Sequence, residues 1–250
     1  MELQKIEFDL EQVNEDDIRY YYNEDLGKFP SVSTVLKTMP EGEGLKIWKE
    51  NLASKGIDPD ERLQYTAVRG TTIHYLITKH LADESSQEPP PLEFSSEEEQ
   101  QLFEELNRTN DFSREVSRSY LIFVDKFIYD HDLKAVKNGL EFKVLSQKYK
   151  YAGTVDILGY LDGKLTLIDI KTSRRVRDKH EIQAWAYYQA LFETHGVKAE
   201  QVAILAVPPD KSFLGKPVNP GENYQLAVFT EEKLRDFLYY RDKFRMEYGF

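Results

Sequence analysis

The sequence predicts an α/β fold with a helical N-terminal cap and a sheet in the middle of the chain. Two observations indicate this: the hydrophobic pattern changes from helical to strand-like near residue 139 and returns to helical near residue 178. The 250 residues suit one generous domain or two small ones, and no internal repeat is visible. We expect one domain, with N-terminal strands and a helical cap (1–130), a core (131–210) and a C-terminal strand and helix (211–250).

The N-terminal part is expected to begin with strands and continue with helices. Lys5–Leu10 and Ile18–Tyr22 resemble short strands separated by an acidic turn. Pro30-Ser31 opens a helix, for which Ser31 or Ser33 is a suitable N-cap. Amphipathic patterns and turn residues further predict helices at 44–54, 68–81, 97–106 and 113–129, and a proline-rich surface loop at 83–96.

The middle of the chain contains the runs that are typical of strands. The expected strands are Gly139–Leu145, Tyr151–Leu161, Lys164–Ile170, Gln201–Val207 and Tyr224–Phe229. Helices are expected between and after them, at Asp178–Thr194 and Glu231–Tyr248. Asp162-Gly163 is a strong two-residue hairpin signal, so the second and third of these strands should pair antiparallel.

The hairpin brings two carboxylates together. Leu161 and Lys164 flank the turn, so Asp156 and Asp169, at equal distances from it, are directly opposed on one face. Lys171 follows two residues after Asp169 and faces the same way. Two bare carboxylates this close repel each other unless a cation lies between them. Hard oxygen ligands suit Mg²⁺ or Mn²⁺, which could polarise a phosphodiester and help to ionise a water molecule.

The alternative is that these charges form only the polar face of an exposed hairpin. Ile157, Leu158, Leu167, Ile168 and Ile170 make both strands too apolar for that interpretation. Charges in a largely buried sheet favour a site.

Composition and charge restrict the class of protein further. Cysteine is absent, which excludes disulfides, thiolate zinc sites and a cysteine nucleophile. No apolar run approaches the length of a membrane span and no signal peptide is recognisable, so we expect a cytoplasmic protein with no membrane partner. The net charge is −11, yet residues 134–179 contain eleven Lys and Arg against five Asp and Glu. A basic strip on an acidic body could attract phosphates locally; the alternative is a basic patch without function.

Five short elements occur in one order: His74 on an early helix, Glu141 on a strand, Gly153 with Asp156, Asp169 with Lys171, and Gln183 with Tyr187. This ordered set resembles the PD-(D/E)XK nuclease superfamily, in particular its RecB-type branch. Each element alone is weak, but the ordered set spans about residues 69–190. The segment Pro30–Leu36 and the expected helix with Trp48 are similar to those of small phage-type and mitochondrial genome maintenance-type exonucleases. The missing cysteines separate this chain from relatives that carry an iron–sulfur cluster.

The resemblance implies a restriction-endonuclease-like core, in which helices flank a central mixed sheet, and a role for each matching residue. The implied ligands of Mg²⁺ or Mn²⁺ are His74, Asp156, Asp169, the Ile170 carbonyl and, directly or through water, Glu141. Lys171 would serve the attacking water. Gln183 and Tyr187, four residues apart on a helix, would line the site. The alternatives are structural roles: His74 as a buried helix histidine, Glu141 as an exposed strand acid and Tyr187 as a core aromatic residue.

The substrate expected from this resemblance is DNA. Arg69, Arg174, Arg175, Arg177 and Lys179 are candidate phosphate contacts. Trp48, Tyr65 and Tyr149 are candidates for stacking on unpaired bases or, equally, for the core. We expect a metal-dependent exonuclease that favours single-stranded ends, in DNA replication, recombination or repair. The alternatives are an endonuclease of the same fold (restriction or flap-cutting) and an inactive DNA-binding subunit; the intact Asp156, Asp169 and Lys171 argue against inactivity.

Overall fold

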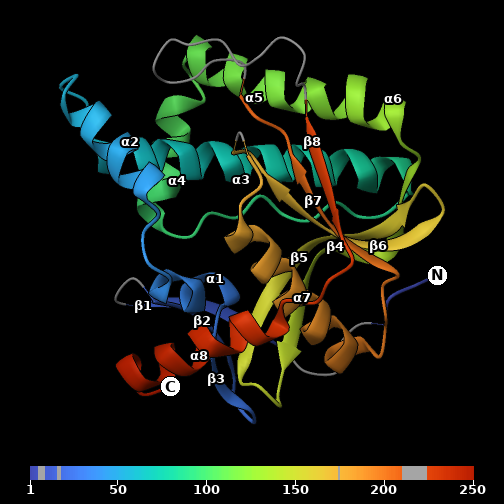
Figure 1. Ribbon diagram of the computed structural model, residues 1–250. Helices are drawn as coiled ribbons and strands as arrows, with labels where there is room; N and C mark the ends of the chain where they lie inside the picture. The colour runs from blue at the N-terminus through green and yellow to red at the C-terminus, as the bar shows by residue number, and fades with distance from the viewer. Residues whose placement is uncertain (5–8, 16–17, 174, 210–223) are drawn as a thin grey trace.

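A five-stranded mixed sheet forms the centre of the protein. The computed structural model describes residues 1–4, 9–15, 18–173, 175–209 and 224–250 (Figure 1). The strands are β4 (Leu133–Ser146), β5 (Tyr151–Leu161), β6 (Lys164–Lys171), β7 (Gln201–Ala206) and β8 (Gln225–Phe229), adjacent in that order. Only β6 and β7 pair in parallel. A parallel pair needs a crossover, which helix α7 (Asp178–His195) provides.

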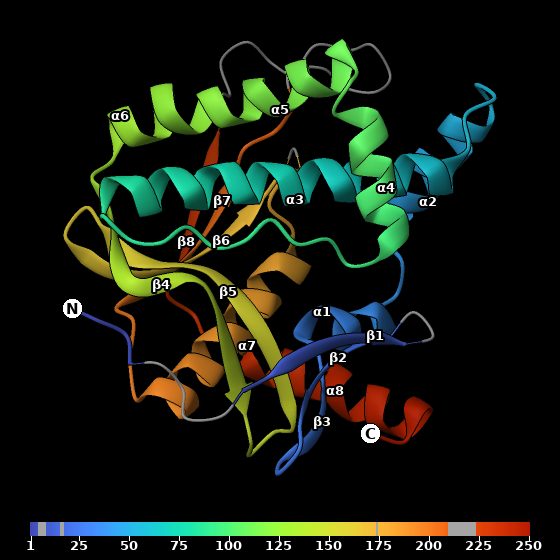
Figure 2. The same ribbon diagram turned by 180° about the vertical axis from the view of Figure 1, so that it is seen from behind.

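Helices cover both faces of this sheet, as the two opposite views show (Figures 1 and 2). One face packs against α7, α8 (Leu234–Tyr248) and α1 (Val32–Val35). The other packs against α3 (Pro59–Glu84), α5 (Asn110–Ile122), the π-helical turn η2 (Phe123–Phe127) and α6 (Ile128–Asp130). Strand alternation divides β6 between them: Leu165 and Leu167 belong to the α7 side, and Ile168 and Ile170 to the α3 side. The fold is therefore α/β, with a mixed sheet flanked by helices.

A second, three-stranded sheet lies against β4 and β5. It consists of β1 (Glu11–Glu15), β2 (Ile18–Asn23) and β3 (Gly27–Pro30), all antiparallel. Leu10, Tyr21 and Phe29 on its inner side form a small core with Leu145 and Ala152. The short helices η1 (Leu36–Thr38), α2 (Glu43–Ala53) and α4 (Glu97–Leu106) complete the described part of the chain.

The hairpin predicted around Asp162-Gly163 is present with the expected register. Asp162 has φ 50° and Gly163 φ 82°, which are the two positive values that a type I′ turn requires. The ladder runs from Leu161–Lys164 to Ile157–Ile168. One position further along lie Asp156 and Asp169, so the two-residue turn determines the neighbourhood of both carboxylates.

Most other predicted elements are present, with corrections at particular places. The helix at 97–106 and the strand at 151–161 have the predicted bounds. Ser31 is the N-cap of α1, since its side chain accepts from the Thr34 amide. Helix α3 begins at Pro59 instead of Val68, because the Asp58 carboxylate caps the amides of Asp60 and Glu61.

Three predictions about the ends of elements were wrong. Glu11–Glu15, expected as part of an acidic turn, is the strand β1; residues 5–8 of the strand predicted at Lys5–Leu10 lie outside the described part, as do residues 211–223 of the C-terminal segment. The helix expected at 113–129 changes to π-helix at Phe123. Strand β4 begins at Leu133 and not at Gly139, because a shift of register between Ala135 and Leu140 breaks the alternation that would have revealed it.

The close packing of α7 on β5 depends on a residue without a side chain. A Cβ atom on Gly153 would lie 2.3 Å from Cε1 of Tyr187. Both the strand and the ring are buried, so the added atom would force one of two packed elements to shift. We predict that Gly153→Ala destabilises the protein by about 1–3 kcal/mol, as overpacked cores do, measured by urea denaturation.

The matched control is Gly44→Ala in α2, where nothing lies within 4 Å of the added atom. That variant should be neutral or slightly more stable, because alanine favours helix over glycine. Equal stabilities of the two variants would contradict the packing explanation. Restoring stability by Tyr187→Leu in the Gly153→Ala background would support it.

Candidate functional site

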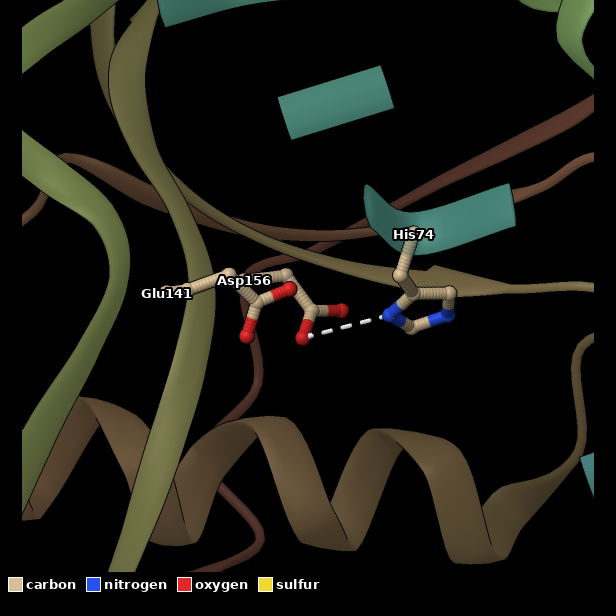
Figure 3. A group of neighbouring side chains, drawn as sticks. All are labelled: His74, Glu141 and Asp156. Carbon is tan, nitrogen blue, oxygen red and sulfur yellow. Dashed lines mark ion pairs between the residues drawn. The ribbon is translucent and has the colours of Figure 1, made fainter. Parts of the chain in front are cut away.

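Three side chains from separate elements converge just beyond the end of the hydrogen-bonded ladder between β5 and β6. His74 comes from α3, Glu141 from β4 and Asp156 from β5, and one ligand atom of each lies within 4.8 Å of the other two (Figure 3). The Nδ1 atom of His74 is 3.6 Å from Oδ1 of Asp156. Among the described residues this is the group of histidine and acidic side chains that could hold a metal ion.

Glu141 reaches this point because the backbone of β4 is irregular. The β4–β5 register shifts between Ala135 and Leu140, and Glu141 itself has φ 44°. Such a left-handed conformation is uncommon for a residue that is not glycine. A β-bulge of this kind redirects a side chain from the regular alternation, and here it turns the Glu141 carboxylate toward Asp156 and His74.

At the site, beyond the last backbone pair of the ladder, a side-chain hydrogen bond holds β5 and β6 together. Oδ2 of Asp156 accepts a hydrogen bond of 2.5 Å from the Ile170 amide. The amide and carbonyl of an extended residue point to the same edge of a strand. The Ile170 carbonyl therefore faces the Asp156 side; its role as a metal ligand stays a prediction.

Asp169 lies beside the three-residue group and has its own partners. It is 1% exposed, and its oxygens are 2.9 and 2.7 Å from Nζ of Lys171. Gln183 donates to Oδ1 of Asp169 at 3.1 Å and to the Tyr187 hydroxyl at 3.0 Å. The structure thus brings together all five elements of the motif, with the Asp169–Lys171 pair between the candidate ligands and α7.

The carboxylates of the site are close together and poorly hydrated, so they do not all ionise easily. Burial and the charge of Asp156 raise the pKa of Glu141 to about 8. Burial also raises the pKa of Asp169 to about 6, although Lys171 opposes this. Burial would raise the pKa of Asp156 as well, but His74 and Lys171 outweigh it and lower that pKa below its usual value.

The donor set fits a divalent cation. Burial alone would lower the pKa of His74, but the charges of Asp156 and Glu141 outweigh it and raise this pKa. An acid with a pKa near 8 and an imidazole that favours its charged form both indicate excess negative charge at one point. Carboxylate and carbonyl oxygens suit Mg²⁺ or Mn²⁺, and one imidazole is compatible with Mn²⁺. His74, Glu141 and Asp156, with Asp169 and the Ile170 carbonyl adjoining, are the residues that would hold it.

The site opens into a cleft of about 1230 Å³. Its walls come from α3, the start of α4, the sheet β1–β2, the start of α1 and the motif residues. This exceeds the roughly 300–1,000 Å³ of a pocket for a small molecule. The cleft therefore has room for a polymer, with the candidate metal centre at its floor.

Basic side chains gather where β6 passes into α7. Burial and the positive charges of Lys37, Lys171 and Arg177 lower the pKa of Lys179. Burial, Lys171, Arg177 and Lys179 lower the pKa of His180 to about 3, which keeps its ring neutral. Arg175 and Arg177 are exposed and Lys179 is half-buried. This positive region directly adjoins Lys171 and could receive phosphates.

The structure does not support all of the residues predicted to contact phosphates or to stack on bases. Arg69 is a correction: its side chain is buried and forms an ion pair of 2.6 Å with Glu115, so its guanidinium serves the packing of α3 on α5 and is not available to DNA. Arg174 lies outside the described residues. Tyr65 packs its ring edge-on against Phe112, which favours the core alternative for that residue.

The other two stacking candidates lie apart from the cleft. Trp48 is half-buried on α2, and Tyr149 lies at the turn between β4 and β5, where its carbonyl accepts from Arg241. Neither residue lines the described cleft.

Sequence reasoning missed the residues that the N-terminal sheet brings to the cleft. Tyr21 bonds Thr154 at 2.9 Å, two residues before Asp156, and Asn14, Arg19 and Lys143 also line the cleft. Their contacts span long stretches of chain, so no local motif marks them. The strand predicted at Ile18–Tyr22 was the local signal nearest to these residues.

No family model matches this chain, and no curated protein does. Solved structures do match it. One of them is the crystal structure of SSO0001, which aligns with 71% of this chain and 73% of its own length, at 14% identity and a TM-score of 0.32. Similarity at that TM-score carries no argument about fold or function. In the described part of the chain, no helix has both the length and the apolar composition that crossing a bilayer demands.

The raised pKa values predict that metal binding releases protons. Glu141, with a pKa of about 8, and Asp169, with a pKa of about 6, hold protons in the metal-free protein below these values. A ligand must be deprotonated to bind. Affinity for Mn²⁺ should therefore rise as pH increases from 6 to 8, by about tenfold per pH unit for each proton displaced.

Calorimetric titration with Mn²⁺ at about pH 7, in two buffers of different ionisation enthalpy, measures the proton release directly. In Glu141→Gln the release should diminish and binding should weaken. Glu105→Gln, an exposed acid outside the cleft, should leave both unchanged. Affinity independent of pH over this range would contradict the assigned ligands.

Proposed function

We propose that this protein is a metal-dependent nuclease that hydrolyses phosphodiester bonds of DNA. The observation that carries the proposal is the gathering of two buried carboxylates and one half-buried carboxylate, one imidazole and one ammonium group in a single cleft. Such an arrangement is costly for folding without a cation, and that cost is typical of functional sites. The five-stranded mixed sheet with helices on both faces is compatible with the restriction-endonuclease-like core that the motif implies.

Each residue of the site has a distinct task in this proposal. A divalent ion bound there would polarise the phosphodiester and lower the pKa of a water molecule. His74, Glu141 and Asp156 bind that ion. Lys171 orients the attacking water or stabilises the negative charge that develops on the phosphate.

Two residues of α7 hold the Asp169–Lys171 ion pair in place. Gln183 donates to Asp169 and to Tyr187, so it fixes the carboxylate against which Lys171 rests. Tyr187 in turn lies over Gly153. Helix α7 thereby connects the rigid packing of the sheet to the position of the ammonium group.

We further propose that the enzyme is an exonuclease acting on single-stranded ends in DNA replication, recombination or repair. The exposed Arg175 and Arg177 with Lys179 supply charge for phosphates. An endonuclease of the same fold is the alternative, and the cleavage of closed circles distinguishes the two.

The chemistry is tested with isosteric variants. Asp169→Asn and Lys171→Met remove one charge each with little change of shape. Each should reduce the degradation of labelled DNA in Mg²⁺ or Mn²⁺ by at least about a hundredfold. The measurement is a time course on 5′- and 3′-labelled single- and double-stranded DNA, with a chelator as blank.

The matched control for these variants is Asp162→Asn. It makes the same change on the same hairpin, in the exposed turn, and asparagine tolerates the positive φ there. It should retain full activity. Retained activity in both site variants, with folding confirmed by circular dichroism, would refute the assigned chemistry.

The basic region is tested by the salt dependence of binding. In Arg177→Gln with Lys179→Gln, the slope of log K against log salt concentration should become shallower by about 0.7 for each phosphate that these side chains no longer neutralise on single-stranded DNA. Binding is measured by fluorescence anisotropy in chelator. Lys164→Gln, exposed beside the hairpin turn, should preserve the slope. An unchanged slope in the double variant would show that phosphates are bound elsewhere on the protein.

A further inference from the structure

The candidate metal centre suits phosphodiesters, but its side chains do not distinguish a nucleic acid from another phosphodiester polymer. Its carboxylates, imidazole and ammonium group would contact the metal ion, the water or the phosphate, and contacts of that kind carry no information about bases. Recognition of a nucleobase without regard to sequence needs a flat apolar surface in the cleft, and an aromatic ring provides it.

Four tyrosine and phenylalanine side chains of the described residues line the cleft: Tyr21, Tyr75, Phe94 and Tyr187. Three of them have structural tasks. Tyr21 and Tyr187 are 2% and 6% exposed, and the hydroxyl of each has a hydrogen-bond partner. Phe94 packs its ring against Phe103, with centroids 4.9 Å apart. These three rings therefore belong to the packing of the cleft wall.

Tyr75 differs from them because no apolar packing accounts for its ring. On the same helix, Ile73 and Ile77 are fully buried in the cluster between α3 and the sheet, and Leu76 packs against that cluster. Tyr75 belongs to none of the three apolar clusters that the described residues form. Its side chain is half-buried and lines the cleft. A tyrosine ring placed in this way is available to a ligand.

The position of Tyr75 in the chain places it beside the candidate metal centre. It follows His74 directly, and consecutive Cα atoms are about 3.8 Å apart. Consecutive side chains of an α-helix diverge by about 100°, so the two leave α3 at neighbouring points in different directions, and both line the same cleft. A base resting on the Tyr75 ring would therefore belong to a nucleotide next to the phosphate at the metal centre.

The neighbours of the ring on α3 suit a nucleotide. Nζ of Lys79 lies 5.9 Å from the centroid of the Tyr75 ring. Lys79 is exposed, so its flexible side chain can bring positive charge to a phosphate that flanks the stacked base. Thr71 and Thr78, four residues before and three residues after Tyr75, are its neighbours on the helix surface and also line the cleft. Neither side chain is large enough to cover the ring.

Building on the proposed nuclease function, we infer that Tyr75 recognises the nucleobase: its ring stacks on the base of a nucleotide next to the phosphate at the metal centre. Every base has a π-face, so this contact accepts any sequence. A base can lie on the ring only after it has left the stack of its neighbours. The substrate class is thereby narrowed from phosphodiesters in general to polynucleotides with an unstacked base at the site.

Two probes of equal charge test the ring by their binding. One is an oligothymidylate; the other has the same length and phosphates but a tetrahydrofuran abasic unit at every position, so that no register restores a base. Affinities are measured by fluorescence anisotropy with Mn²⁺ in the Lys171→Met background, which retains the candidate metal ligands and should cleave slowly. This protein should prefer the oligothymidylate, and adding Tyr75→Leu should reduce the preference at least about fivefold.

Three controls separate stacking from general damage. Tyr75→Phe keeps the ring and should keep the preference. Tyr75→Leu should leave the affinity for the abasic probe unchanged, because a merely structural role would weaken both probes alike. Tyr129→Leu makes the same change on α6, at a side chain that is 87% exposed and outside the cleft, and should change neither affinity. An unchanged preference in Tyr75→Leu, or equal weakening of both probes, would overturn the inference.

Cleavage by the wild-type protein then locates the stacked base. On a strand with one abasic nucleotide, products resolved by length should show one bond, at a fixed offset of one or two nucleotides, cut at least about fivefold more slowly than its neighbours. In Tyr75→Leu that difference should disappear. A wild-type ladder without a slow bond would overturn the inference. A wild-type protein that cuts no strand would contradict the proposed nuclease, while the binding probes would still decide whether Tyr75 stacks on bases.

Discussion

The position of negative charge is the constraint on which this structure depends. Asp156, Asp169 and Glu141 are held close together in a place where water is scarce, and the local fold contains several devices that make this tolerable. A lysine and an imidazole lie against two of the carboxylates, and a backbone amide donates to one. The raised pKa of Glu141 shows that these devices do not suffice. The remaining imbalance is what a divalent ion would relieve in the function proposed above.

Much of this site follows from local patterns. The two-residue turn at Asp162-Gly163 determines the register of β5 and β6, and the register determines which residues oppose each other. Alternation then puts Lys171 on the face of Asp169, and helical spacing puts Gln183 beside Tyr187. These relations involve neighbours in the sequence or in one hairpin, and for that reason they could be predicted from the residues alone.

Other parts of the fold depend on contacts that no local pattern records. Arg69 had the sequence context of a phosphate contact, but Glu115 on another helix pairs with it. The early start of β4 was hidden because the register shift between Ala135 and Leu140 interrupts the alternation. The hydrogen bond from Lys143 of β4 to the Leu10 carbonyl beside β1 could form only after the two sheets had packed. The contribution of the N-terminal sheet to the cleft is thus a tertiary property, while the pairing of Asp156 with Asp169 and Lys171 follows largely from secondary structure.

The left-handed backbone at Glu141 has a consequence for how this position could be altered. Asparagine and aspartate adopt positive φ more readily than glutamate, so either would relax the chain here. Both are shorter by one methylene, and the carboxylate or amide would then stop short of Asp156 and His74. At this position, the residues that adopt the backbone conformation most readily have side chains too short to reach the site. A redesign for stability alone would replace Glu141 early, and in doing so would remove one of the three side chains proposed to hold the metal ion.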